Sequence, residues 1–152
     1  MKEIERKFLV RSGQFPKTGS TLVMRQGYLS VDQERIVRIR IEGDKAWLTV
    51  KGKISGITRP EFEYSIPVPD AEEMLKLSLF PPVEKVRHRL ETMGTKWEVD
   101  EFLGANQGLI LAEVELKDEN QSFDRPDWLG MEVTSDQRYY NAYLTRKPFS
   151  TW

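Results

Sequence analysis

The chain of 152 residues contains no cysteine and a single histidine, His88. Disulfide bonds, thiolate catalysis and zinc sites built on cysteine are therefore excluded. No apolar run approaches the roughly 20 residues that cross a membrane, and the N-terminal segment is charged where a signal peptide needs an apolar core. We therefore expect a cytoplasmic protein that has no membrane partner.

The sequence also lacks an excess of charge of either sign, because 23 Lys and Arg residues stand against 24 Asp and Glu residues. A net charge of -1 argues against a polybasic nucleic-acid-binding protein. Any electrostatic function must therefore come from the local arrangement of the charges. The length fits one domain over residues 1–152 and is sufficient to bury a core without disulfide bonds.

Short runs of alternating apolar and polar residues predict a mainly antiparallel β protein of the α+β class. Turn signals such as Glu42-Gly43-Asp44 and Met93-Gly94 separate neighbouring runs, and such short connections favour antiparallel strands. The predicted strands cover about residues 2–10, 23–31, 35–42, 45–53, 61–67, 84–91, 96–103 and 110–117.

Two helices are predicted among these strands. Asp70 and Glu73 have the spacing of a capping box, which predicts a helix over 71–79 that ends before two prolines. Thr134 and Gln137 have the same spacing and predict a second helix over 135–146. Its apolar side, which carries three tyrosines and Leu144, is suited to cover an end or a side of a barrel.

The first predicted strand carries Glu3, Glu5 and Lys7 at every second position. Since successive side chains of a strand point to opposite faces, these three charges share one face, opposite Ile4 and Phe8. Two hard oxygen donors beside an ammonium group can hold a magnesium-bridged polyanion. The alternative for these ten residues is a solvated face on a half-buried strand.

The same division into a charged and an apolar face recurs in the later strands, and several charged faces carry one sign only. The basic lines are Arg38 with Arg40, Lys51 with Lys53, and Lys85 with Arg87 and Arg89; the acidic lines are Glu61 with Glu63, Glu98 with Asp100, and Glu113 with Glu115. A merely solvated face gains from mixing the signs, because like charges side by side on a sheet repel each other. A sheet closed with these lines inward would form a water-filled tunnel that has an acidic side and a basic side.

The ordered set of charged motifs resembles the triphosphate tunnel metalloenzymes, also called the CYTH family. Glu3-Ile4-Glu5-Arg6-Lys7 matches the Glu-x-Glu-x-Lys signature of that family. The later matches are Val37-Arg38-Ile39-Arg40, Thr49-Val50-Lys51-Gly52, Glu61-Phe62-Glu63, Lys85-Val86-Arg87, Val99-Asp100 and Ala112-Glu113-Val114-Glu115-Leu116. The end of the chain, with Gly130-Met131-Glu132-Val133-Thr134 and Arg138-Tyr139-Tyr140-Asn141, is similar to that of short bacterial members.

The resemblance implies a closed eight-stranded β-barrel with a few covering helices, and it implies roles for the charged residues. Divalent metal would be held by Glu3, Glu5, Asp100, Glu113 and Glu115, while Glu61 and Glu63 would help a second ion or its waters. Oxygen ligands without cysteine favour Mg²⁺, or Mn²⁺, over zinc. The polyphosphate would be bound by Lys7, Arg38, Arg40, Lys51, Lys85 and Arg87.

The implied reaction is attack of a metal-activated water on a terminal phosphorus. Lys85, Tyr28 and Glu63 are the catalytic candidates, since Lys85 and Tyr28 share the charged parity of their strands and can order water. His88 has the opposite parity to Lys85 and is expected to be structural or on the surface. Trp47, Trp97 and Phe62 are expected to pack on the outside of the barrel.

Hydrolysis of inorganic triphosphate is the leading function, because so short a chain leaves little for a pocket that binds an organic group. A class IV adenylyl cyclase, a thiamine or nucleoside triphosphatase and a noncatalytic polyphosphate-binding domain are the alternatives. The partner is then a small triphosphate or polyphosphate and no nucleic acid, because the interleaved acidic residues would repel a phosphate backbone. The resemblance further suggests a homodimer that forms through the outer apolar surface.

Overall fold

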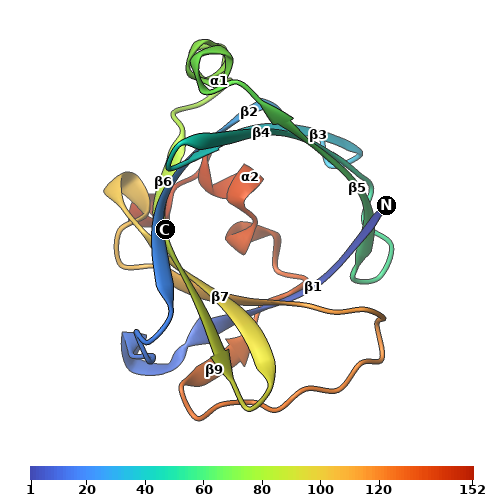
Figure 1. Ribbon diagram of the computed structural model, residues 1–152, viewed down its shortest axis with the longest axis vertical. Helices are drawn as coiled ribbons and strands as arrows, with labels where there is room; N and C mark the ends of the chain where they lie inside the picture. Colours follow the sequence, from blue (N-terminus) through green and yellow to red (C-terminus); the bar gives the residue numbers. More distant parts are fainter.

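The computed structural model describes residues 1–152 and shows a closed antiparallel barrel (Figure 1). The strands are β1 (Lys2–Val10), β2 (Ser20–Ser30), β3 (Arg35–Glu42), β4 (Lys45–Gly52), β5 (Thr58–Ile66), β6 (Val83–Thr92), β7 (Thr95–Phe102), β8 (Ile110–Glu115) and β9 (Leu129–Glu132). The hydrogen-bonded order is β5-β4-β3-β2-β6-β7-β8-β1-β9, and β1 also pairs with β5. The predicted eight-stranded barrel is thereby confirmed, with β9 as an additional strand.

The first strand closes the barrel because its two halves have different partners. Along one edge, Lys2 to Ile4 pair with Pro60 to Thr58 of β5. Along the other, Glu5 to Leu9 pair with Glu115 to Leu111 of β8. The later part of β1 also pairs with β9, which lies outside the closed ring of eight strands. The Glu-x-Glu-x-Lys segment therefore lies at the seam where the two ends of the sheet meet.

Two packed apolar clusters lie on the outer side of the barrel wall. Phe8, Trp97 and Val99 belong to one cluster with Leu129 of β9, and Phe123 and Trp128 of the loop that precedes β9 pack against it. A second cluster joins Ile39 and Ile41 of β3 to the helix α1 (Val68–Leu75). Because these apolar faces are covered from outside, the opposite parity of each strand is turned into the barrel.

The first helix differs from the prediction at both ends. It begins at Val68 and ends at Leu75, whereas the capping-box spacing predicted 71–79. Pro67 occupies the N-cap position and no side chain caps the helix, so the Asp70 capping box is wrong. Pro69 at the second helical position accounts for the earlier start, because proline tolerates the first turn, where its missing N–H has no helical partner.

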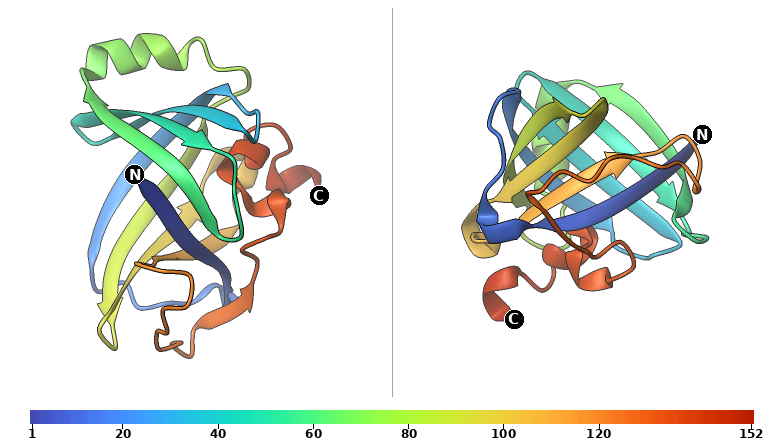
Figure 2. Two further views of the ribbon diagram at one scale, coloured as in Figure 1. Left: turned by 90° about the vertical axis from the view of Figure 1, so that its right-hand side faces the viewer. Right: turned by 90° about the horizontal axis from the view of Figure 1, so that it is seen from below.

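The predicted second helix is also wrong in extent. Gln137–Tyr139 form one turn of 3-10 helix, which Asp136 caps by accepting a hydrogen bond from the Arg138 backbone N–H. Tyr140 is extended, and α2 then covers only Asn141–Leu144. Even so, this segment lies across one end of the barrel, as the apolar side of the predicted helix suggested (Figure 2).

The strand β9 was not predicted, because four residues with a glycine give too short a pattern to recognise. Three further turns of 3-10 helix cover Arg11–Gly13, Gly104–Asn106 and Phe149–Thr151. None of the helices is long and apolar enough to span a bilayer.

Candidate functional site

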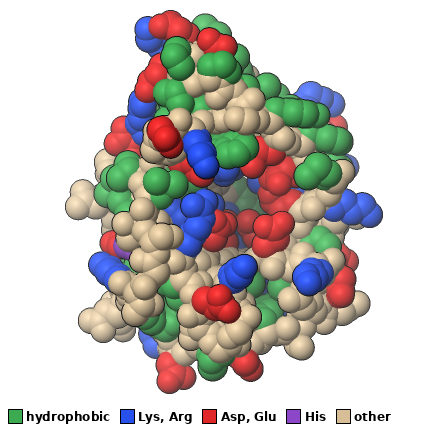
Figure 3. Space-filling view, viewed as in Figure 1, with side chains coloured by type: hydrophobic (Ala, Val, Ile, Leu, Met, Phe, Trp, Pro, Cys, Tyr) green, Lys and Arg blue, Asp and Glu red, His purple; other side chains and the backbone are tan.

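The barrel encloses a cavity of about 300 Å³ whose wall is mostly polar. In the space-filling view the centre of the barrel is hollowed, and Lys, Arg, Asp and Glu side chains surround the hollow (Figure 3). The charged lining residues are Glu3, Glu5, Lys7, Arg38, Arg40, Lys51, Arg59, Glu61, Glu63, Lys85, Arg87, Arg89, Glu98, Glu113 and Glu115. The predicted convergence of Arg40, Lys51, Glu63 and Glu115, which are distant in sequence, is thus confirmed.

Among the residues predicted to form the site, Asp100 is the only one that does not line this cavity. Its carboxylate is completely buried behind Lys85 and Arg87. Asp100 accepts hydrogen bonds from Arg87 Nε at 2.8 Å and Arg87 Nη2 at 2.9 Å, and its Oδ2 lies 2.8 Å from Lys85 Nζ. Both oxygens are therefore engaged by cations, and Asp100 supports two lining residues; its predicted contact with a metal ion stays a prediction.

Two arginines on β3 present guanidinium groups that lack full pairing. Arg38 Nη2 lies 3.4 Å and Arg40 Nη2 3.5 Å from Glu63 Oε2, so one carboxylate oxygen serves both side chains. The Nε atoms of both arginines are buried without a hydrogen-bond acceptor, although Arg40 Nε is 3.3 Å from a Glu42 oxygen. Burial, and then the neighbouring Arg38, lower the pKa of Arg40 to about 10.

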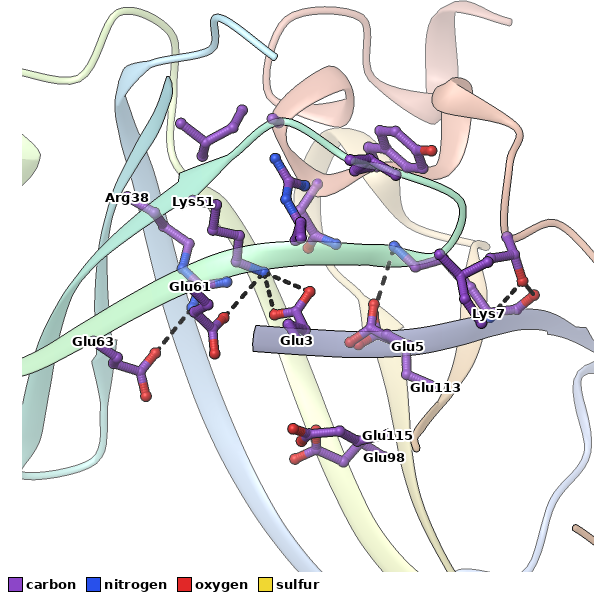
Figure 4. A pocket seen from close by; sticks show the side chains of 18 of the residues that line it. Glu3, Glu5, Lys7, Arg38, Lys51, Glu61, Glu63, Glu98, Glu113 and Glu115 are labelled. Atoms are coloured by element: carbon purple, nitrogen blue, oxygen red, sulfur yellow. Dashed lines mark hydrogen bonds and ion pairs between the residues drawn. The ribbon is translucent and has the colours of Figure 1, made fainter. Parts of the chain in front are cut away.

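On β4, the strand that pairs with β3, Lys51 binds the first part of the acidic cluster (Figure 4). Its Nζ lies 2.7 Å from Glu3 Oε2 and 3.4 Å from Glu61 Oε2. Burial favours the neutral form of Glu3, but Lys51, with the help of Glu61 and Arg38, outweighs it and lowers the pKa of Glu3 to about 2. Burial and the neighbouring Glu3 carboxylate raise the pKa of Glu61 to about 7. These two carboxylates therefore share a single ammonium group.

Glu5 is the least compensated carboxylate of the site. It stands directly opposite Glu115 in the β1–β8 ladder, where like charges repel. Burial, then repulsion by Glu113 and Glu3, raises the pKa of Glu5 well above its ordinary value. Glu113 itself has a lowered pKa, because Lys7 and Arg87 outweigh the effect of its burial; the Lys7 Nζ is 3.7 Å away. Glu5 therefore has no ion-pair partner, and Lys7 and Lys51 offset its charge only in part.

The acidic residues fit a hard divalent cation in chemistry, and the uncompensated Glu5 carboxylate supports such a site. As they stand, no three carboxylates lie close enough together to hold one ion. Glu3 and Glu61 bind Lys51 instead, so binding a metal ion requires that the side chains of this cluster rearrange.

The closed end of the cavity contains three polar residues beside Lys85. Tyr28, Tyr140 and Asn141 line this end, and Asn141 is the first residue of α2. Gln26, which is 1% exposed, donates hydrogen bonds from Nε2 to Tyr28 Oη at 3.1 Å and to Asn141 Oδ1 at 3.0 Å. Sequence reasoning missed Gln26 and Asn141, although Gln26 has the same strand parity as Tyr28 and could have been found from it.

The residues expected outside the site do lie outside the cavity. His88 is buried in the outer layer, where its Nε2 is 2.7 Å from Glu101 Oε1 and its ring contacts Phe15 edge-on. Trp97 is buried in the apolar cluster with Phe8, while Phe62 is 43% exposed on the outer face of β5. None of these side chains, nor Trp47, is among the lining residues.

Comparisons with known proteins agree with this architecture. The chain is 47% identical over 152 residues to an inorganic triphosphatase of Acetivibrio thermocellus, covering 99% of this chain and 97% of that protein. It is 39% identical over 149 residues to an inorganic triphosphatase of Nitrosomonas europaea, covering 95% and 97% of the two chains. A crystal structure of an inorganic triphosphatase superposes with a TM-score of 0.69 at 36% identity, covering 94% and 93% of the chains.

The agreement extends to the family. Residues 1–142 match the CYTH domain, which is the greater part of the chain and includes every charged strand that lines the cavity. The opening Glu-x-Glu-x-Lys segment lies at the barrel seam, and the later charged lines meet it inside. This protein therefore belongs to the CYTH family.

Proposed function

We propose that this protein hydrolyses inorganic triphosphate in its barrel, with the help of a divalent metal ion. The observation that carries the proposal is that one cavity contains both cationic side chains and a carboxylate that lack full pairing. Arg38 and Arg40 keep buried N–H donors without acceptors, while the buried carboxylate of Glu5 has no ion-pair partner. A polyphosphate with its metal ion supplies both missing partners, and two relatives at 47% and 39% identity are named inorganic triphosphatases.

Six carboxylates would hold the metal: Glu3, Glu5, Glu61, Glu63, Glu113 and Glu115. Mg²⁺ or Mn²⁺ suits an all-oxygen site, and either ion would supply positive charge that neutralises the phosphate and activates water. Release of Lys51 from Glu3 and Glu61 would free both carboxylates for the metal and the ammonium for a phosphate oxygen.

The basic residues would bind and orient the three phosphoryl groups. Arg38, Arg40 and Arg87 suit bidentate contacts with phosphate oxygens, whereas Lys7, Lys51 and Lys85 provide compact charges. In phosphoryl transfer the charge spreads over the oxygens of a largely dissociative transition state, so catalysis depends on such positioned cations. Lys85 would stabilise the reacting terminal group, and Tyr28 and Glu63 would help to order the attacking water.

The substrate we favour is inorganic triphosphate because the cavity is small and mostly polar. A screen of phosphate release and product identity with Mg²⁺ and with Mn²⁺ tests this choice against ATP, thiamine triphosphate and longer polyphosphates. Fastest turnover of inorganic triphosphate is expected. Conversion of ATP to a cyclic nucleotide and pyrophosphate would identify a cyclase instead, and binding without turnover of any compound would identify a noncatalytic domain.

The expected homodimer and the expected absence of nucleic-acid and membrane partners stay predictions. Nothing in the proposed reaction requires a second copy, because all the groups named above come from one chain. Size-exclusion chromatography with light scattering would measure the oligomeric state directly.

Arg40→Ala is expected to raise the KM for inorganic triphosphate by roughly 10- to 100-fold, since a charge-assisted hydrogen bond contributes about 1.5–3 kcal/mol. A contact that already forms in the bound substrate moves KM more than kcat. Arg35→Ala is the matched control, because Arg35 is an exposed arginine on the same strand that does not line the cavity. Steady-state kinetics with saturating Mg²⁺ measure both variants, and an unchanged KM for Arg40→Ala would remove Arg40 from the phosphate site.

The metal-free protein is expected to be more stable at pH 5.5 than at pH 7.5. Burial and Glu3 raise the pKa of Glu61 to about 7, so folding favours its protonated form; the resulting cost to stability grows as the pH rises from about 4.5 to 7. The difference should be about 1 kcal/mol after allowance for solvent screening at this part-exposed group. Thermal unfolding in EDTA at the two pH values measures it, and saturating Mg²⁺ should reduce the difference.

A further inference from the structure

Lys85 is held at the closed end of the cavity by two hydrogen-bond acceptors, one on β7 and one on α2. Its side chain is 2% exposed, and its Nζ lies 2.8 Å from Asp100 Oδ2 and 2.9 Å from Asn141 Oδ1. An ammonium group has three N–H donors and no acceptor. Two donors are thus directed at protein oxygens, which leaves one for a phosphate oxygen or a water in the cavity. Asn141 and Asp100 together therefore set the direction of the remaining donor.

Asn141 is itself fixed by a second amide. Its Oδ1 also accepts a hydrogen bond from Gln26 Nε2 at 3.0 Å, and the same Nε2 donates to Tyr28 Oη at 3.1 Å. Because the lysine can only donate, the oxygen of the Asn141 amide must face it, and its Nδ2 must point elsewhere. Since that oxygen can only accept, Gln26 must in turn present its nitrogen.

This orientation leaves Gln26 Oε1 buried without a hydrogen-bond partner. Buried side-chain oxygens are nearly always paired, so an unpaired one needs an explanation. Rotating the amide would give Oε1 the Tyr28 hydroxyl as a partner but would place it against Asn141 Oδ1. In this arrangement Gln26 Oε1 therefore lacks a hydrogen bond, while Asn141 Oδ1 stays directed at Lys85.

We propose that Asn141, fixed by Gln26, is a positioning residue that aims the Lys85 ammonium at the reacting phosphoryl group. The proposal rests on the proposed triphosphatase function and adds two residues to it. Neither residue need touch the reacting atoms, because Asn141 acts through Lys85 and Gln26 acts through Asn141. The short helix that closes the barrel thus contributes to turnover, in addition to covering one end of the cavity.

Asn141→Ala is expected to lower kcat on inorganic triphosphate by about 10- to 100-fold, since displacing a catalytic group by about 1 Å can lower the rate up to about 100-fold. KM should change by less than about threefold, because the contacts of Arg38 and Arg40 are unaffected. Asn141→Asp keeps an oxygen for Lys85 and for Gln26, so it should restore most of kcat. It also brings a negative charge to the lining, so its KM should rise.

The decisive measurement is a double-mutant cycle with Lys85→Ala. If Asn141 acts through Lys85, Asn141→Ala should cause no further loss of kcat in the Lys85→Ala protein. Tyr143→Ala is the control for general damage to α2, because Tyr143 lies in the same helix and does not line the cavity; it should keep kcat within about twofold. Thermal unfolding of each variant reports whether the fold is kept.

The proposal would be overturned if the two substitutions lowered kcat multiplicatively in the double mutant, if Asn141→Ala changed KM alone, or if Asn141→Asp and Asn141→Ala lost equal kcat. In each of these cases, turnover by the wild-type protein would leave the triphosphatase function intact. Absence of turnover in the wild-type protein would overturn both.

Discussion

A Glu5→Gln variant is expected to lose turnover of inorganic triphosphate on the order of 100-fold or more, because a metal ion contributes several kcal/mol to stabilising the charge of the transition state. The substitution keeps the shape of the side chain and replaces a charged oxygen donor by a neutral amide. Glu5 lies at the barrel seam, opposite Glu115 and near Glu113 and Glu3, where it forms no ion pair and Lys7 and Lys51 offset its charge only in part.

The same variant is expected to keep or gain stability when no metal is present. The raised pKa of Glu5, caused by burial and then by Glu113 and Glu3, means that its charged form opposes folding at neutral pH. Removing that charge relieves the repulsion, as is common where a strained site serves function. Glu91→Gln, a change at an exposed glutamate on β6, is the control and should alter neither the turnover nor the stability.

Kinetics over a range of Mg²⁺ concentrations, together with thermal unfolding in EDTA, test both expectations for Glu5. Undiminished activity at limiting Mg²⁺ would remove Glu5 from the metal site. A variant that loses activity and also loses stability in EDTA would point to a structural role instead.

Asp100→Asn is expected to have the opposite signature, with lower stability even in the absence of metal. The Asp100 carboxylate is fully buried and compensates both Lys85 and Arg87. Breaking a buried ion pair by removing one partner costs about 3–5 kcal/mol, because the remaining charge is left uncompensated in a poorly solvated place. For a protein of this size such a loss lowers Tm by roughly 6–20 °C.

This result distinguishes the two roles considered for Asp100. If Asp100 is a metal ligand in an acidic cluster without metal, removing its charge should stabilise the protein. If it is the counter-ion of two buried cations, removing its charge should destabilise the protein. Turnover should fall in either case, so the unfolding temperature in EDTA is the informative measurement. An unchanged or raised Tm for Asp100→Asn would return Asp100 to the metal-ligand role predicted from the sequence. Excess triphosphate should partly restore Tm, because it brings negative charge to Lys85 and Arg87.

The alternation of residue types along the strands was sufficient to predict most of the fold. The charged and apolar parities of β1, β3 and β8 are set by a side-chain period of two, which holds for any strand whatever its partners. The predicted strand limits for 35–42 agree with β3, and those for 2–10 agree with β1. Helix limits were less predictable, since Pro67 and Pro69 decided the start of α1 where the capping pattern pointed to Asp70.

The role of each charged residue could be predicted less well than the face of the sheet on which its side chain lies. Asp100 has the same parity as Glu98, yet Glu98 lines the cavity and Asp100 lies buried behind Lys85 and Arg87. Parity places a side chain on one face of the sheet, but it does not fix the depth of that side chain along the tilted barrel. Depth depends on the register between neighbouring strands, such as the pairing of Arg87 with Asp100.

The sequence by itself determined that a charged face exists, that its signs are segregated by strand, and that the chain resembles a family of metal-dependent triphosphatases. Only the tertiary structure decided which charges compensate one another, because those pairings join residues as distant as Lys51 and Glu3. It alone also brought Asn141 to Lys85 and Gln26, across 56 and 115 positions of the chain. Such contacts depend on barrel closure and on the packing of the C-terminal segment against its end, and neither leaves a local periodic pattern in the sequence.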